Sequence, residues 1–240
     1  VFETLHQRRD GSTFPVEISS NVIELEGRRY KLGILRDITE RKAHEREIER
    51  LSRLYATLSQ VNQSIVRVDT RQQLFQNVCR IAVKFGGFKL AWIGWPDAVT
   101  QRVTPVAYAG DAEAFLEETR VRIDHGAEGR GPVGICLQES RSCVFNDFLA
   151  DERAQPWREG AAKYGLRAVA AFPIRYNGKV CAAFAVCAGE PHVFQDQEVA
   201  LLEETAYDIS FALENLEREE RRRAAEEALR GSAAALLEAQ

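Results

Sequence analysis

The sequence predicts an α+β fold with an antiparallel sheet of five or six strands. We expect helices to pack on one face of this sheet, loops and short helices to cover the other, and long helices to lie at both ends. Two β-rich runs flank Asn177-Gly178, a pair that tolerates positive φ at both central positions of a tight hairpin turn. The run that follows, 196–216, carries apolar residues at helical spacing. Neither face of the hairpin is polar, so both faces must be covered.

The two-residue turn also fixes which residues of the hairpin face one another, because side chains alternate between the two faces. The expected cross-strand partners are Tyr176 with Lys179, Ile174 with Cys181, and Phe172 with Ala183. Alanines are frequent in both strands, so a helix or a ligand can approach the sheet closely.

Composition and charge are those of an ordinary globular chain. It has 240 residues, of which 45% are hydrophobic and 28% charged, and a formal net charge of −4. No basic stripe with interleaved aromatic residues is present, so we expect no nucleic-acid binding. No apolar run is long enough to cross a bilayer and no signal peptide is visible, so we expect no membrane contact by this chain.

Five cysteines are scattered through the chain without a C-x-x-C pair. Most lie in apolar surroundings, as buried free thiols do in a reducing compartment, and we therefore expect a cytoplasmic location. Because Val1 lies inside a predicted strand, we also expect a fragment of a longer protein.

The first 38 residues predict two consecutive hairpins, which turn at 9–12 and at Glu26-Gly27. The motif DITERK follows, and the side chains of Asp37 and Thr39 can hold this strand-to-helix junction by capping hydrogen bonds. Together, RRDGSTFPVEIS and DITERK resemble the C-terminal part of a PAS domain, over 1–42. The resemblance implies that the front of that domain, with its ligand-binding helices, is absent from the chain.

A helix without Gly or Pro is predicted from Glu40 to about Val66. Its apolar stripe alternates spacings of three and four residues, at Ile48, Leu51, Tyr55, Leu58, Asn62 and Ile65, and is widened by Leu54 and Val61. On a helix that leaves a PAS domain, this stripe implies a parallel coiled coil in which Asn62 helps to set the register. The alternative is a helix that packs only on the sheet after it, and both can hold along its length. We expect a homodimer joined through the N-terminal and C-terminal helices.

The middle of the chain predicts one further helix, three strands and two short helices. Thr70 is expected to cap the helix, and Gly86-Gly87 to stop it. The strands are expected over 89–95, 102–109 and 143–146, and the short helices over 112–120 and 155–164.

The order of these elements resembles a GAF domain, the small-molecule sensing module of signalling proteins. The matching residues are Pro173-Ile174 at the end of a strand, Gly178 in the turn, Phe194, Glu198, and the helix from Leu201-Leu202 to Glu214-Asn215. The resemblance covers about 52–216. It implies a signalling helix over 43–68 before the domain, and a helix over 217–240 that leads to a domain outside the chain.

The resemblance implies a ligand pocket between the sheet and a roof formed by 125–165. The polar and aromatic candidates for this site are Trp92, Trp95, His125, Asn146, Asp147, Trp157 and Arg158. Four glycines in the roof, Gly126, Gly129, Gly131 and Gly134, would suit a lid. Arg158 is expected to orient an anionic or carbonyl group of the ligand. Alternatively, Trp157 fills the core and Arg158 pairs with Asp151 or Glu152.

We expect that the chain is not an enzyme. It has no phosphate-cradling Gly-rich loop and no recognisable Ser/His/Asp arrangement. Cys136 and Cys143 are similar to the cysteines of free methionine sulfoxide reductases, which are enzymes on a GAF fold, but the paired pattern of that family is not reproduced. The alternative is a pair of buried, inert thiols.

The cofactor is left open, and no metal site is expected. His125 could be an axial haem ligand, although no second ligand is suitably spaced. Bilin attachment needs a Cys-His pair, which does not occur. A cyclic-nucleotide motif is only partial, because Asn146 is followed by Asp147 and not by lysine.

These observations favour a cytoplasmic sensory and relay module. It would bind a small molecule of unknown identity in the GAF pocket and transmit its state through dimeric helices. The output would be a histidine kinase or a cyclic-di-GMP enzyme outside this chain. One alternative is a ligand-free dimerisation and relay spacer, and a second is a haem-binding gas or redox sensor. A roomy pocket would favour the sensor, and a collapsed one the spacer.

Overall fold

The structure of the protein is a computed structural model that describes residues 1–65 and 68–238. The predicted helix end at Val66 and the predicted seam side chain of Ile65 lie outside the described part, as do the side chains of 228–240. The chain forms two compact units, Val1–Ser52 and Arg53–Gln240. Within the described residues, no helix combines the length and the apolar character that a membrane span requires.

The first unit is a three-stranded antiparallel sheet followed by the start of a helix. Its strands are β1 (Phe2–Gln7), β2 (Thr13–Leu25) and β3 (Arg28–Asp37), in that order, and the helix is α1 (Thr39–Ile65). The backbone N–H of Thr39 donates to the Asp37 carboxylate at 2.9 Å, and the Thr39 hydroxyl donates to the same oxygen at 2.5 Å. These two bonds confirm the expected cap at the strand-to-helix junction.

The second unit contains an antiparallel sheet of six strands, which confirms the predicted fold class. The strands are β4 (Leu90–Pro96), β5 (Arg102–Gly110), β6 (Val121–Arg122), β7 (Cys143–Phe145), β8 (Ala168–Tyr176) and β9 (Lys179–Ala188). They lie in the order β6-β5-β4-β9-β8-β7. The two hairpin strands β8 and β9 are therefore inside the sheet, as their apolar faces require.

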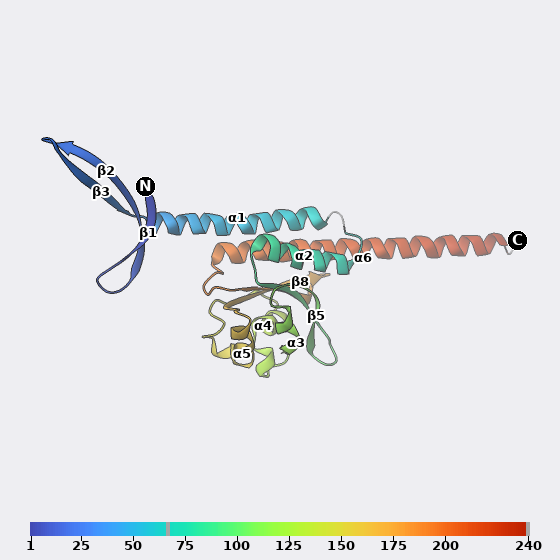
Figure 1. Cartoon of the computed structure of the whole chain (residues 1–240). Coiled ribbons are helices and arrows are strands. Elements are labelled where there is room, and N and C mark those ends of the chain that lie inside the picture. The colour runs from blue at the N-terminus through green and yellow to red at the C-terminus, as the bar shows by residue number, and fades with distance from the viewer. Residues whose placement is uncertain (66–67, 239–240) are drawn as a thin grey trace. The chain divides into compact units, whose positions relative to one another are not determined.

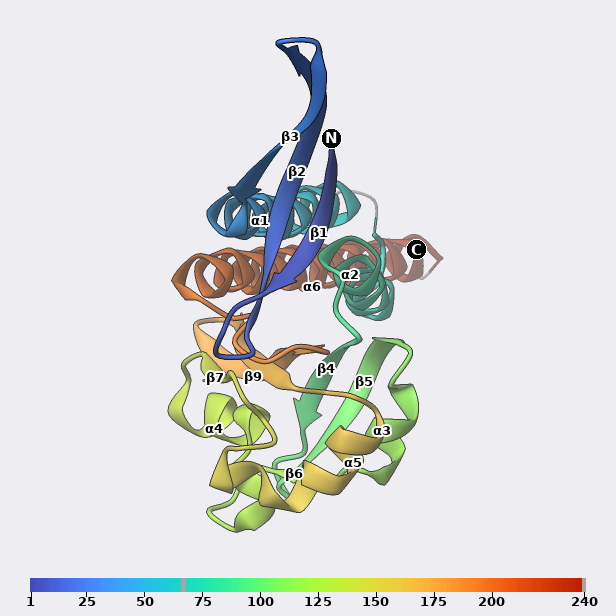
Figure 2. The ribbon, with the colours of Figure 1, turned by 60° about the vertical axis from the view of Figure 1, so that its left-hand side comes forward.

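Helices cover the two faces of this sheet differently (Figure 1 and Figure 2). One face carries the long helices α2 (Arg71–Gly86) and α6 (Asp196–Glu238). The other carries α3 (Glu113–Glu118), α4 (Pro132–Glu139) and α5 (Arg158–Lys163), with the 3₁₀ turns η1 (Ala127–Gly129) and η2 (Glu152–Trp157). The Thr70 side chain accepts from the backbone N–H of Gln73, and Gly87 ends α2 with φ of 72°, so both predicted ends of α2 are confirmed.

The β8–β9 turn has positive φ at Asn177 (50°) and Gly178 (75°), which confirms the predicted tight turn. The predicted register holds only beside the turn, at Tyr176 and Lys179. A β-bulge between Ile174 and Arg175 shifts the ladder by one residue, so the remaining pairs are Ile174 with Ala182 and Phe172 with Phe184. The predicted partners Cys181 and Ala183 were therefore wrong. The bulge adds a residue to one strand, and nothing in the alternation of the sequence marks it.

The second half of α1 packs within the second unit. Leu54 and Val61 are 4% and 0% exposed, and Thr57 lies against the backbone at Gly86 near the end of α2. Asn62 lies near Asp208 of α6 in the same chain, where it opposes the rise that burial gives to the pKa of this carboxyl. The stripe expected to meet a partner is therefore used in large part by the chain itself, while Ile48 and Tyr55 stay exposed.

Candidate functional site

A small apolar cavity lies between the sheet and its roof, at the expected place of the ligand pocket. We call it the roof cavity. Its volume is about 40 Å³. It is lined by Trp92, Phe115, Thr119, Val121, Gly131, Pro132, Val133, Phe148, Trp157, Val169 and Cys187. A drug-sized ligand needs about 300–1,000 Å³, so the cavity holds at most a few water molecules.

Trp157 is the reason that the roof cavity is small. Its indole is 6% exposed, and its Nε1–H donates to the backbone carbonyl of Arg120 at 2.9 Å. The ring lies 6.5 Å from that of Phe148, centroid to centroid. A Cβ atom on Gly131 would come within 2.6 Å of the indole. Trp157 therefore fills the core of the roof, as the alternative reading of this residue expects.

Two of the predicted site residues, Trp92 and Trp157, line the roof cavity. His125 is exposed and lies outside it. The Asn146 side chain is engaged with the backbone of Phe194, donating to its carbonyl at 2.6 Å and accepting from its N–H at 2.9 Å. Trp95 is also elsewhere, stacked under the Arg71 guanidinium at 4.9 Å. The expectation that His125 and Asn146 line the pocket is thus corrected. His125 lies in a loop outside the roof cavity, and the Asn146 amide is bound to the backbone of Phe194.

Asp147 and Arg158 do not line the roof cavity either. Asp147 faces Arg167 at 3.6 Å. Arg158 donates to the backbone carbonyl of Asp151 at 3.1 Å. The expectation that Arg158 orients a ligand in the pocket is therefore corrected, because this hydrogen bond holds the side chain against the backbone just before η2.

Two of the roof glycines, Gly129 and Gly134, are close-packed against the backbone rather than arranged as a lid. A Cβ atom on Gly129 would lie 1.7 Å from the backbone oxygen of Asp124, and one on Gly134 would lie 2.3 Å from that of Gly129. These contacts need the absence of a side chain. The expectation of lid flexibility at these two positions is replaced by a packing role.

All five cysteines are free thiols. Burial raises the pKa of the Cys136 thiol to about 12 and that of the Cys143 thiol to about 11. The two are close enough that the thiolate of Cys143 would raise the pKa of Cys136 further. Both are therefore protonated at neutral pH, and a thiol reacts through its thiolate.

The described residues contain no group of three His, Cys, Asp or Glu side chains that could hold a metal ion. His125 has an exposed side chain in the loop before η1. We find no geometry there that supports the haem alternative.

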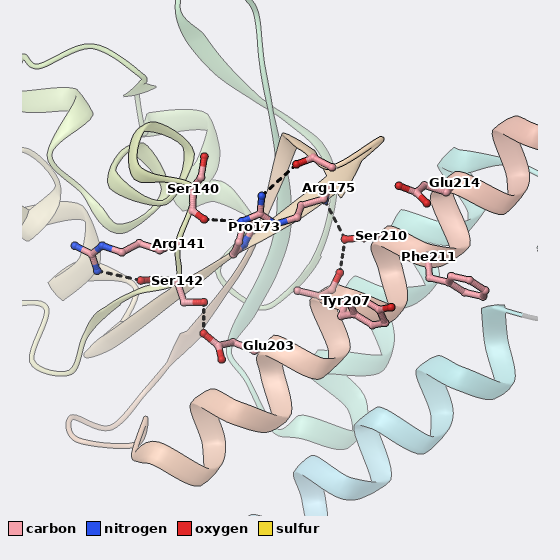
Figure 3. Close-up of a pocket in the computed structure, with 12 residues that line it drawn as sticks. Ser140, Arg141, Ser142, Pro173, Arg175, Glu203, Tyr207, Ser210, Phe211 and Glu214 are labelled. Atoms are coloured by element: carbon pink, nitrogen blue, oxygen red, sulfur yellow. Dashed lines mark hydrogen bonds between the residues drawn. The ribbon is translucent and has the colours of Figure 1, made fainter.

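A larger cavity, which the sequence did not predict, lies on the other side of the sheet, beside α6 (Figure 3). We call it the α6 groove, and its volume is about 500 Å³. Its lining residues come from the 140–142 turn, the end of β8, the β8–β9 turn and α6: Ser140, Arg141, Ser142, Pro173, Arg175, Gly178, Glu203, Ala206, Tyr207, Ser210, Phe211 and Glu214. A possible sequence signal was the pair Tyr207 and Phe211, aromatic residues outside the core stripe of α6.

The family comparisons agree with the fold. The GAF domain model matches residues 68–214, and a PAS domain model matches residues 1–40. No curated protein sequence matches the chain closely enough to count as a relative.

Solved structures with a similar fold include three kinds of protein. The GAF domain of a phosphoenolpyruvate-protein phosphotransferase from Acinetobacter has a TM-score of 0.54 at 15% identity, over 70% of this chain and 97% of that one. A domain of a putative two-component sensor histidine kinase from Sinorhizobium meliloti has a TM-score of 0.51 at 17% identity, over 65% and 99%. Free methionine-R-sulfoxide reductase from Neisseria meningitidis, in complex with its substrate, has a TM-score of 0.58 at 14% identity, over 69% and 90%.

The reductase corrects one expectation from the sequence, that the chain is not an enzyme. It is an enzyme on the same fold, and similar structures are known for a second reductase of this kind, from Staphylococcus aureus. A GAF fold can therefore be enzymatic, and at 14% identity the likeness says no more than that. The match of the family model to 68–214, together with the six-stranded sheet, shows that the chain belongs to the GAF domain family.

Proposed function

We propose that the chain is a sensory or regulatory module that relays a conformational state between its N-terminal and C-terminal helices. The observation that carries this proposal is α6 itself. It is one uninterrupted helix, Asp196–Glu238, whose first half lies in the core while its second half runs on beyond the sheet (Figure 1). Leu202, Ile209 and Leu213 are at most 1% exposed, whereas residues 220–227 are exposed. A shift of the sheet would therefore move the outer half of the helix.

Polar contacts support the coupling between α6 and the β8–β9 hairpin. The Ser210 hydroxyl accepts from the backbone N–H of Arg175 at 2.9 Å, and the Glu214 carboxylate accepts from that of Asn177 at 2.9 Å. About two turns beyond Glu214, Arg221 donates to the Tyr176 hydroxyl at 2.6 Å. Together these bonds tie the helix to the end of the hairpin at three levels.

The size of the roof cavity favours a relay over a sensor with a ligand in the GAF pocket. At about 40 Å³ the cavity is collapsed, and a small molecule would enter only if Trp157 moved. The relay reading needs no such movement.

We further propose that the module works as a homodimer through the exposed face of α1. Ile48 and Tyr55 are 68% and 60% exposed and lie seven residues apart, which is the repeat of a coiled-coil seam. A hollow of about 550 Å³ lies beside Tyr55, lined also by Leu58, Ser59, Asn62 and Gln63. A second copy would cover this face. In a parallel pair of helices, Ile48 and Tyr55 would each face the same residue of the other copy.

The similar structures fit a regulatory role, since one belongs to a putative sensor histidine kinase and another to a phosphotransferase. A kinase or cyclic-di-GMP output and a cytoplasmic location stay predictions. The domain limits 1–42, 43–68, 52–216 and 217–240 are also proposals, and they rest on the resemblance of the sequence to PAS and GAF domains.

Hydrogen–deuterium exchange with peptide-level mass spectrometry tests the relay. The double variant Ser210→Ala and Glu214→Ala removes two ties from α6, and Glu226→Ala is the matched control, because among the described residues Glu226 pairs with Arg222 on the same helix. The double variant should raise exchange both in 168–188 and in α6 beyond 216, while the control should leave 168–188 unchanged. Faster exchange in the hairpin with no change in α6 beyond 216 would refute the relay.

A further inference from the structure

We propose that the α6 groove binds a small zwitterion with an aromatic side chain, of the free amino-acid type. The groove presents a guanidinium and a carboxylate, and the exposed aromatic residues Tyr207 and Phe211 lie along α6 at its edge (Figure 3). This goes beyond the relay, because binding here can be measured whether or not a signal passes along α6.

Arg175 supplies a positioned cation. Its Nη2 donates to the backbone carbonyl of Ser140 at 2.7 Å, and its Nη1 donates to that of Gly178 at 3.4 Å. Among the described residues no carboxylate forms an ion pair with it, whereas its neighbour Arg141 is neutralised by Glu139 at 2.5 Å. A guanidinium has five donors, so Arg175 retains enough of them to hold a carboxylate.

Glu203 supplies the anion of the groove. One of its carboxylate oxygens accepts from the Ser142 hydroxyl at 2.6 Å, and no described Lys or Arg pairs with it. Arg175 and Glu203 are thus anchored two residues apart on the same 140–142 turn. An α-carboxylate and an α-ammonium on one carbon would match these two opposite charges, whereas a simple anion or cation would satisfy one group and meet the repulsion of the other.

Two aromatic residues of α6 border the groove. Tyr207 and Phe211 lie one turn apart on α6 and are 70% and 56% exposed. Exposed rings of this kind gain by offset or edge-to-face contact with another ring. The volume of about 500 Å³ lies within the range of small-molecule sites. The apolar part of the ligand is therefore expected to be aromatic.

Isothermal titration of the whole chain with L-phenylalanine tests the proposal. The matched probes are 3-phenylpropionate, which lacks the ammonium, and phenethylamine, which lacks the carboxylate. The affinity of each should be at least about tenfold lower than that of L-phenylalanine, because each probe loses one charge-assisted hydrogen bond. Absence of binding by L-phenylalanine up to about 10 mM, or equal binding of all three probes, would overturn the proposal.

Variants locate the site. Glu203→Gln and Tyr207→Ala should each weaken binding about tenfold, and neither side chain is buried, so the fold should persist. Tyr108→Ala is the matched control, since Tyr108 is an exposed tyrosine on β5 outside the groove. Arg175→Gln should abolish binding, and if it unfolds the chain the other two variants decide. Unchanged affinity in both Glu203→Gln and Tyr207→Ala would overturn the assignment.

Discussion

The hydroxyl of Ser210 on α6 accepts a hydrogen bond of 2.9 Å from the backbone N–H of Arg175 on β8. Ser210 is buried, and its hydroxyl donates in turn to the carbonyl of Ala206 on its own helix at 2.7 Å. The bond lies next to the β-bulge between Ile174 and Arg175, beyond the last residue that pairs with β7. A long helix therefore satisfies a donor that the sheet leaves without a strand partner.

Ser210→Ala should lower the free energy of unfolding by about 1–3 kcal/mol, because the partly buried N–H of Arg175 loses its acceptor. Urea unfolding measures this change. Ser59→Ala is the control, since Ser59 is exposed on α1 and accepts only a long hydrogen bond of 3.4 Å from Gln63. Equal stability of the two variants would show that the bond contributes nothing.

Trp157→Ala should cost about 3–5 kcal/mol and convert the roof cavity into a larger hole. Added indole should restore part of the loss, because it can refill the space and donate to the Arg120 carbonyl that Trp157 uses. Thermal unfolding with and without indole tests this. Trp95→Ala provides the control, because Trp95 lies outside the roof cavity and indole should not rescue it.

Gly129→Ala should destabilise the roof by about 3 kcal/mol or more, because the new Cβ would overlap the backbone oxygen of Asp124. Gly126→Ala should be mild, since its Cβ would meet only the end of the Asp124 side chain, at 2.9 Å. Denaturant unfolding of both variants distinguishes packing from lid flexibility. If the two glycines tolerated alanine equally well, close packing at Gly129 would be excluded.

Stability should fall as the pH rises above the ordinary thiol pKa. Burial raises the pKa of Cys187 to about 12, while in the unfolded chain it ionises near about 8.5. Between these values only the unfolded state loses the proton, so unfolding becomes easier by up to about 1.4 kcal/mol per pH unit. The stabilisation is complete below about pH 8.5 and declines above it.

The matched variant for this effect is Cys187→Ala, which removes one such thiol. Unfolding free energies at about pH 8 and about pH 10 should differ less in the variant than in the unmodified chain. Parallel losses in both proteins would mean that Cys187 is not the source.

Local chemistry made parts of the fold predictable from the sequence. Asn177-Gly178 specifies its turn through positive φ, and Thr70 and Gly87 mark the ends of α2. The register was not predictable beyond the turn, because the alternation of the sequence does not show the bulge between Ile174 and Arg175. The N–H of Arg175, beside this bulge, bonds to Ser210 of α6, which alternation does not show either. The face that α1 buries is likewise decided by α2 and α6, not by its own stripe.

The candidate site was less predictable. The sequence placed Trp92 and Trp157 in the roof cavity, but whether an indole lines or fills a cavity depends on the volume around it. The α6 groove joins Ser142 to Glu203, 61 residues apart, so no local pattern could reveal this contact, and only the aromatic residues Tyr207 and Phe211 gave a signal. His125 and Arg158 were chosen for their chemistry, but His125 lies in a loop and Arg158 at the start of α5, and neither lines the roof cavity.

The most direct test of the relay is an electron–electron distance measurement between two copies of the chain. A spin label at Glu220, which is exposed on α6, would be used in a background with the half-exposed Cys181 changed to serine. The account predicts one narrow distribution of distances in the dimer, shifted or broadened by Ser210→Ala but not by Glu226→Gln. The absence of any distance between copies, or the same distribution with and without the Ser210 hydroxyl, would contradict it.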